Sequence, residues 1–335
     1  TSVPITTFYY QSGNANNAAN WNSLLAGGGT PAVGADFSVS GNTFIVPSGR
    51  TAPLAANRVV GAGATLRVAS GGTFDAATFA LTGAGNFDLQ AGGTLQASNG
   101  TGFNGGAITC TGRTWSPSAN YTFAPTVANC NINIATAQVN NLTTISAVGN
   151  IQLSGSLTVN GTYTGGSWFS VLCGGNLTLG AGAHTSSGGM WLGGTNGLTV
   201  NGTLTFTSGA NFYLVGTSGC GSNGSVNGSG SITYNAGAVL QLVSGWTGTV
   251  TSTLLPTTMN GDVILSGTAT VNATSTINGT INVAGGTMTL NAPMAVAGTL
   301  TMSGGIINST AVNSLTISNT SVGAITGGSA TSYVN

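Results

Sequence analysis

The sequence predicts an all-β fold, a single-stranded parallel β-solenoid (β-helix) of about 15 coils with about 20 residues in each. Three observations lead to this prediction. First, short runs such as residues 281–283 (INV) and 287–290 (TMTL) alternate apolar and polar side chains, which is typical of half-buried strands. Second, the phrase LTVNGT at residues 157–162 returns at residues 198–203, a shift of two predicted coils. Gly-Gly, Gly-Thr and Asn-Gly pairs separate the runs and supply the backbone freedom that tight turns need.

The third observation is the composition. Glycine makes up 56 of the 335 residues, 2% of the residues are charged, and neither lysine nor glutamate occurs. An ordinary soluble domain is roughly 25% charged. Helix is disfavoured because its surface formers are absent while Gly, Ser, Thr, Asn and Val abound. The net charge of +0 excludes the clustered Lys and Arg of nucleic-acid binders and of polybasic membrane patches, and no apolar run approaches the roughly 18 residues of a membrane-spanning helix.

At the start of the chain, residues 1–30 are expected to form an N-terminal cap. Phe8, Tyr9, Tyr10 and Trp21 crowd this short stretch. The first coil of a solenoid leaves open strand edges that must be covered, and aromatic bulk serves that purpose. The alternative is a platform on which carbohydrate rings stack.

The rest of the chain varies in regularity. Residues 31–105 contain regular alternating runs, whereas residues 106–135 are bulkier and less periodic and predict a lateral loop or a change in coil cross-section. The clearest repeats lie in residues 149–335. Three irregular inserts are expected to leave the coils as loops, around residues 168–169, 184–191 and 212–224.

No linker or shift in composition divides residues 31–335, so we expect one continuous solenoid domain. Residues 322–335 read as the middle of another coil rather than as a polar cap. We therefore expect either that the solenoid continues beyond Asn335 or that a neighbour covers this end.

Four cysteines allow three pairings. The interval from Cys110 to Cys130 matches one predicted coil, which would bring the two side chains close enough for a disulfide between neighbouring coils. The interval from Cys173 to Cys220 fits two coils and an insertion, which is a poorer match. The alternative is that all four are buried thiols that fill space as small apolar side chains.

Residues for enzyme chemistry are scarce. A glycosidase needs two carboxylates within about 5–10 Å, but the interval from Asp75 to Asp88 is much shorter than the coil period. We interpret these aspartates as surface or turn residues that pair with nearby arginines. His184, the only histidine, lies in GAGAHTSSGG and is interpreted as an exposed loop residue rather than part of a catalytic triad. No zinc spacing and no lysine-containing phosphate loop occurs, so we predict no catalytic, cofactor or metal site.

Three segments carry a family resemblance: TTFYYQSGNANNAANWNSLLAGGGTPA near the start, the GGTL and VNGTL coils, and SVGAITGGSATSYVN at the end. They resemble the repeat regions of very large secreted surface proteins of Bacteroidota, which use the type IX pathway and include gliding and attachment adhesins. The resemblance covers most of the chain. It implies an extracellular, cell-surface rod or filament that serves adhesion or mechanical extension, and it carries over no catalytic residue.

The first functional hypothesis is therefore a non-catalytic structural or adhesive segment of a surface protein, without a cofactor. Its expected partners are other copies or further domains of the same protein, and glycans or cell surfaces. The contacts would be made by aromatic side chains near the inserts, namely Trp168, Trp191 and Trp246. Nucleic acid and direct membrane insertion are not expected, because the chain lacks both a basic patch and a long apolar run.

Two other hypotheses belong to different classes. A secreted binding module would recognise ice or carbohydrate through threonine arrays, because the Thr-x-Thr spacing of Thr287 with Thr289 and of Thr299 with Thr301 puts both hydroxyls on one face. In the sequence this spacing recurs in few coils and at unequal intervals. A polysaccharide-degrading enzyme is the third hypothesis, and the scarcity of acids argues against it.

Overall fold

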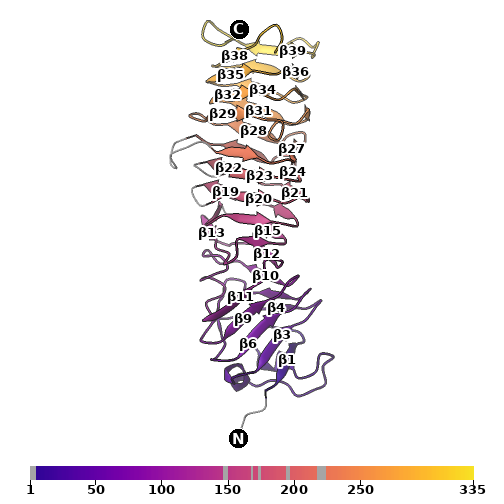
Figure 1. Cartoon of the computed structure of the whole chain (residues 1–335), viewed down its shortest axis with the longest axis vertical. Coiled ribbons are helices and arrows are strands. Elements are labelled where there is room, and N and C mark those ends of the chain that lie inside the picture. Colours follow the sequence, from indigo (N-terminus) through magenta and orange to yellow (C-terminus); the bar gives the residue numbers. More distant parts are fainter. Residues whose placement is uncertain (1–4, 146–149, 167–168, 173–174, 194–196, 217–223) are drawn as a thin grey trace. The chain divides into compact units, whose positions relative to one another are not determined.

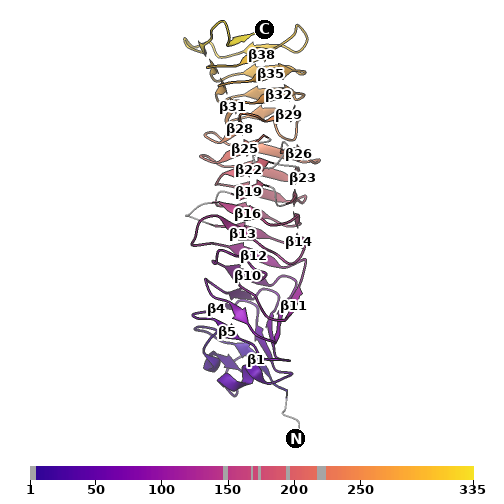
Figure 2. The same cartoon turned by 90° about the vertical axis from the view of Figure 1, so that its left-hand side faces the viewer.

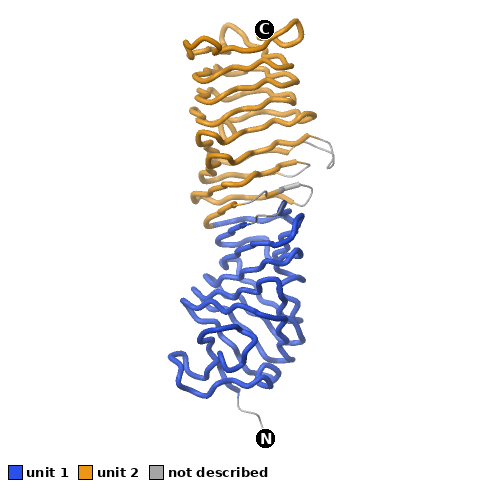
Figure 3. The backbone as a smooth tube through the Cα atoms, turned by 180° about the vertical axis from the view of Figure 1, so that it is seen from behind, with its two compact units in different colours: residues 1–160 blue, residues 161–335 orange. Residues whose placement is uncertain are grey.

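A computed structural model of the chain describes residues 5–145, 150–166, 169–172, 175–193, 197–216 and 224–335. These residues form a parallel β-solenoid of about 13 turns, with no helix beyond two short 3-10 segments, η1 (Ala18–Asn20) and η2 (Gly34–Ser38) (Figure 1). The predicted fold class is confirmed. The chain divides into two compact units, Thr1–Asn160 and Gly161–Asn335 (Figure 3). Among the described residues, no helix has the length and apolar character needed to cross a membrane.

In the first unit, successive turns stack their strands into parallel ladders. One ladder contains, in spatial order, β11 (Gly112–Trp115), β9 (Asn86–Leu89), β6 (Thr65–Val68), β3 (Thr43–Val46), β1 (Thr7–Tyr10) and β2 (Trp21–Asn22). A second contains β15 (Leu142–Thr144), β12 (Asn120–Phe123), β10 (Thr94–Ala97), β7 (Thr73–Asp75) and β4 (Thr51–Pro53). Shorter pairs join β13 (Cys130–Ile132) to β16 (Ile151–Leu153), β14 (Gln138–Val139) to β17 (Leu157–Val159), and β5 (Arg58–Val59) to β8 (Leu81–Thr82).

In the second unit, the longest ladder runs through β19 (Phe169–Leu172), β22 (Met190–Gly193), β25 (Asn211–Leu214), β28 (Val239–Leu242), β31 (Asp262–Leu265), β34 (Ile281–Val283), β37 (Leu300–Met302) and β40 (Ile325–Gly327). The views of Figures 1 and 2 both show its strands one above another. A second ladder holds β18 (Tyr163–Gly165), β21 (Ala183–Ser186), β24 (Thr203–Phe206) and β27 (Ser231–Tyr234), and a third β20 (Leu177–Leu179), β23 (Gly197–Val200) and β26 (Ser225–Asn227).

Two further ladders complete the second unit. One contains β29 (Thr247–Val250), β32 (Thr268–Val271), β35 (Thr287–Leu290), β38 (Ile306–Asn308) and β41 (Tyr333–Val334). The other contains β30 (Thr258–Met259), β33 (Ser275–Ile277), β36 (Met294–Val296) and β39 (Leu315–Ile317). Each turn in this part of the chain therefore supplies three strands, one to each side of the solenoid.

The core follows from the period-two alternation of the strands. In β32, Ala269 and Val271 are buried, while Thr268 and Thr270 face outward. Equivalent inward positions stack from turn to turn, as where Leu177 lies in register with Leu198. Burial of each Leu, Ile or Val side chain contributes about 1.5–3 kcal/mol. The core thus consists of columns of aliphatic and aromatic side chains, and its stability is distributed over many turns.

Turn length varies in the first unit while the ladders stay in register. Arg67 faces Asp88, 21 residues on. Thr111 donates its hydroxyl to the Gly83 carbonyl, 28 residues earlier. The added length of this turn falls between β10 and β11, so it begins within the stretch predicted to be regular and reaches only the start of the predicted irregular zone at residues 106–135.

The second unit shows the same variation. Thr205 faces Thr233, 28 residues on, whereas Asn291 donates its side-chain amide to Asn272, 19 residues earlier. The longer turns account for the difference between the about 13 turns of the structure and the predicted 15.

Two expected inserts differ from the prediction. Residues 184–191 do not form a loop that leaves the coil, because β21 and β22 both lie in ladders there. Phe212 belongs to β25 and is buried, so this residue is not part of a loop that leaves the coil. Within residues 168–169 and 212–224, positions 168 and 217–223 lie outside the described residues.

The N-terminal aromatic residues form a buried cluster. Tyr10 meets the edge of Trp21, with ring centroids 5.3 Å apart, and Trp21 in turn meets Phe37 at 5.8 Å. Phe8 stacks on Phe44 at 5.1 Å. Trp21 lies in β2, which pairs antiparallel with β1 and occupies the outer edge of that strand. Phe8, Tyr10 and Trp21 expose 4% or less of their surface, so the alternative of a carbohydrate-stacking platform built from them is wrong.

Candidate functional site

Each of the four aspartate carboxylates forms an ion pair or accepts a hydrogen bond from a neighbouring residue. Asp88 forms an ion pair with Arg67, with Oδ2 2.7 Å from Nε. The others accept backbone N–H groups rather than arginine: Asp36 from Val33, Asp75 from Ala77 and Asp262 from Thr280. Asp75 lies in β7 and Asp88 in β9, which belong to different ladders. Asp75 and Asp88 are half-buried and lie in strands rather than in turns, and among the described residues only Asp88 has the predicted arginine partner.

His184 is buried, and its prediction as an exposed loop residue is wrong. It lies in β21 with 1% of its surface exposed. Nδ1 accepts the N–H of Tyr163 at 3.0 Å, so Nε2 carries the proton and donates to the Gly180 carbonyl at 3.0 Å. The residue faces inward because it is in register with the buried Leu204. The imidazole thus satisfies two backbone groups inside the coil and serves a structural role.

Cys110 and Cys130 are free thiols, which contradicts the expected disulfide between them. Cys110 precedes β11, whose partner is β9, whereas Cys130 opens β13, whose partner is β16. The turn beside Cys110 is longer than predicted, because Thr111 bonds to Gly83, 28 residues earlier. An interval of one predicted coil therefore does not stack the two cysteine side chains.

Both described cysteines behave as apolar fillers. Burial raises the pKa of Cys110 to about 11 and also raises the pKa of Cys130, so each thiol keeps its proton. Cys173 and Cys220, the second predicted pair, lie outside the described residues.

The three tryptophans that were expected to make surface contacts differ in burial. Trp246 exposes 2% of its surface and donates Nε1–H to the Gly224 carbonyl at 3.2 Å, so its prediction as a surface-contact residue is wrong. Its burial follows from its inward position at the corner before β29. Trp191 is half-buried and stacks on Tyr213, with ring centroids 4.6 Å apart. Trp168 lies outside the described residues.

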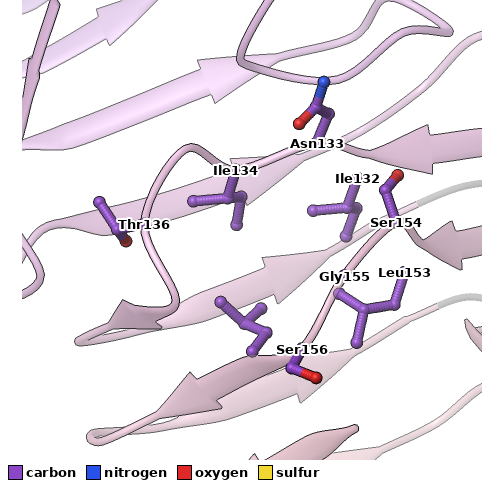
Figure 4. A pocket seen from close by; sticks show the side chains of 9 residues that line it. Ile132, Asn133, Ile134, Thr136, Leu153, Ser154, Gly155 and Ser156 are labelled. Carbon is purple, nitrogen blue, oxygen red and sulfur yellow. The ribbon is translucent and has the colours of Figure 1, made fainter. Parts of the chain in front are cut away.

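Two adjoining hollows lie on the first unit and share Asn133 and Ser154. The smaller, of about 80 Å³, lies between the turns that carry Ile132 and Leu153 (Figure 4). It is lined by Ile132, Asn133, Ile134, Thr136, Leu153, Ser154, Gly155, Ser156 and Leu157. The larger, of about 320 Å³, is lined by Thr101, Asn104, Gly105, Asn131, Asn133 and Ser154.

Neither hollow is lined by a charged residue: the larger is lined by polar residues and glycine, and the smaller by a mixture of polar and aliphatic residues. Asn133 donates to the Asn104 carbonyl at 2.7 Å, and Arg113 donates to Asn104 Oδ1 at 2.7 Å, so this nearby cation is already engaged. Amide and hydroxyl groups without a free charge suit a neutral polar ligand rather than an ion. The lining residues include no nucleophile with a base beside it, and among the described residues no three His, Cys, Asp or Glu side chains gather as metal ligands.

A second surface lies on the ladder of β29, β32 and β35 in the second unit. Each strand presents two outward threonines, and the three pairs are in register from strand to strand. We call these six residues the threonine array: Thr247, Thr249, Thr268, Thr270, Thr287 and Thr289. Only the last pair was predicted from the sequence. Thr301, from the other predicted pair, lies on a different ladder, where it faces Asn282 and Thr326.

No family model matches the chain, and neither the curated proteins nor the solved structures yield a significant match.

Proposed function

We propose that this chain is a non-catalytic structural and adhesive segment of an extracellular cell-surface protein. The observation that carries the proposal is the stack of parallel turns, in which each carboxylate and the single histidine are engaged in local structural bonds. In a stack of this kind the stability is shared among many similar contacts between neighbouring turns. The resemblance to type IX-secreted surface proteins of Bacteroidota supports the extracellular location.

The low charge supports the same proposal. With eight formal charges in 335 residues, few groups can change protonation between folded and unfolded states, so stability depends weakly on pH and salt. Such a chain tolerates surroundings whose composition is not controlled. Its partners are proposed to be further copies or domains of the same protein, together with glycans or cell surfaces, for which the uncharged hollows on the first unit offer hydroxyl and amide groups.

The N-terminal residues are proposed to act as the cap of the solenoid. The antiparallel β2 occupies the edge of β1, and the aromatic cluster beneath it fills the first turn. An exposed parallel edge would otherwise offer unpaired N–H and C=O groups to another chain. We further propose that residues 31–335 act as one continuous solenoid domain.

Protease treatment of intact source cells, followed by detection with an antibody raised against residues 1–335, tests the location and role together. We expect the antigen to be removed from the surface, and deletion of the segment to lower attachment of the cells. An antigen protected inside the cells, or attachment unchanged by the deletion, would contradict the proposal.

A further inference from the structure

We propose that the threonine array is an ice-binding face. This role goes beyond the structural one and does not depend on it. Along one column Thr247 faces Thr268, which faces Thr287, and along the other Thr249 faces Thr270, which faces Thr289.

The array is periodic in two directions. Adjacent strands are about 4.8 Å apart, and alternate residues along a strand are about 6.7 Å apart. Each threonine presents a methyl group and a hydroxyl that both donates and accepts hydrogen bonds. The ligand that matches such a surface repeats at similar intervals in both directions, as the water oxygens on a face of hexagonal ice do.

The positions of the threonines follow the ladder rather than a fixed interval in the sequence. The interval from Thr247 to Thr268 is longer than the interval from Thr268 to Thr287, yet all three pairs stay in register. The shorter turn closes at Gly286, which has a positive φ and where a Cβ would collide with the Gly267 carbonyl. The alignment of the array is therefore set by the register of the ladder and not by a repeated phrase of fixed length.

The hydroxyls of the two later threonine pairs are available. Within the described part of the chain, Thr268, Thr270, Thr287 and Thr289 form no side-chain hydrogen bond with another protein group. A second threonine column in the same unit, through β24 and β27, behaves differently: Thr233 donates to Thr205 Oγ1 at 2.9 Å. That column uses its hydroxyls within the protein and provides an internal control.

The chemistry of the array selects against other ligands. None of its three strands carries a charged residue, so it offers no ionic contact to a phosphate or to an acidic glycan. None of the six outward residues is aromatic, so a sugar ring finds no face on which to stack. The backbone beneath is held by ladder bonds such as Thr268 N–H to the Trp246 carbonyl at 2.8 Å, so the array is ordered before it meets its ligand.

Thermal hysteresis and the shape of single ice crystals, measured on the purified chain of residues 1–335, test this inference. We expect a gap between the melting and freezing temperatures of ice that is larger than in an equally concentrated solution of an inert protein. We also expect the ice crystals to be faceted. Thr270→Tyr and Thr268→Lys should each abolish most of the gap, because each puts a long side chain into the plane of the array. Thr268 is exposed, so its lysine variant is expected to fold even if the tyrosine variant does not.

Thr205→Tyr on β24 is the matched control and should leave the gap unchanged. Circular dichroism and the urea midpoint establish that each variant is folded. The absence of hysteresis in the wild-type chain, or an equal loss in the Thr205 variant, would overturn the assignment. So would sedimentation of the chain with crystalline cellulose or chitin, without ice shaping, if the Thr268 and Thr270 variants abolished it; that result would assign the array to a polysaccharide surface.

Discussion

Replacement of His184 by leucine should lower the free energy of unfolding by several kilocalories per mole. The imidazole is 1% exposed, accepts the Tyr163 N–H and donates to the Gly180 carbonyl. Leucine fills a similar volume but leaves the buried Tyr163 N–H and the part-buried Gly180 carbonyl without their partner. A fully buried group without a partner costs about 1–3 kcal/mol and a part-buried one less, so the two together cost about 2–4 kcal/mol.

Two conservative variants separate the contributions. In His184→Asn, the side-chain oxygen can take the place of Nδ1 and accept the Tyr163 N–H. In His184→Gln, the amide nitrogen can take the place of Nε2 and donate to Gly180. Each variant restores one bond of the pair, so each should lose less stability than the leucine variant.

Urea unfolding followed by circular dichroism measures the loss, provided that the m-value is unchanged. Hydrogen exchange at the Tyr163 amide adds a local measurement, since this N–H should exchange faster in the leucine variant than in the wild type. A free energy of unfolding for His184→Leu within about 0.5 kcal/mol of the wild-type value would refute this prediction. So would a Tyr163 amide that exchanges its hydrogen as slowly as in the wild type.

Three further predictions concern buried groups. Thr144 is fully buried with an unpartnered hydroxyl, so Thr144→Val should raise the urea midpoint by an amount equivalent to about 1 kcal/mol; a lower midpoint would indicate a hidden partner. Trp246→Ala should lower the free energy of unfolding by about 3–5 kcal/mol in the same assay, whereas a tryptophan exposed at the surface would lower it by almost nothing. The pKa of Cys110 is about 11 in the folded chain against 9.0 for an unperturbed thiol, so the unfolded state loses its proton first as pH rises. Stability should therefore fall between about pH 9 and 11, and Cys110→Ala should remove this part of the fall in urea titrations at several pH values.

The fold was predictable because its signal is local and repeated. Residues 287–290 alternate in the sequence just as they alternate in burial, and the Gly-Thr pairs mark the corners. The turn length was not predictable with equal accuracy, because residues added at a corner leave no mark on the strands that follow. The expected disulfide between Cys110 and Cys130 failed for this reason: it assumed the average coil, whereas Thr111 bonds to Gly83, 28 residues earlier.

The site residues were harder to predict because the local composition indicates a loop where the position in the ladder is that of an inward-facing strand residue. Glycine, serine and threonine around His184 suggested a loop, yet the residue stands one turn before Leu204, which is an inward position. That spacing was the available signal. Of the threonine array, only Thr287 and Thr289 were predicted; the other two pairs were missed because the interval between pairs changes from one turn to the next and the pairs align only when the ladders are known.

Because turns of different length keep the ladders in register, the sequence can gain or lose residues at some positions more easily than at others. An insertion at a corner can extend outward as a loop, and a deletion there shortens the connection, so in both cases the neighbouring strands keep their register. A shift of a single residue within β35 would instead send Met288 to solvent and Thr287 and Thr289 into the interior. The fold should thus tolerate segments inserted at corners far more readily than a one-residue shift within a strand. The corners are therefore the places where this architecture can acquire new binding specificity.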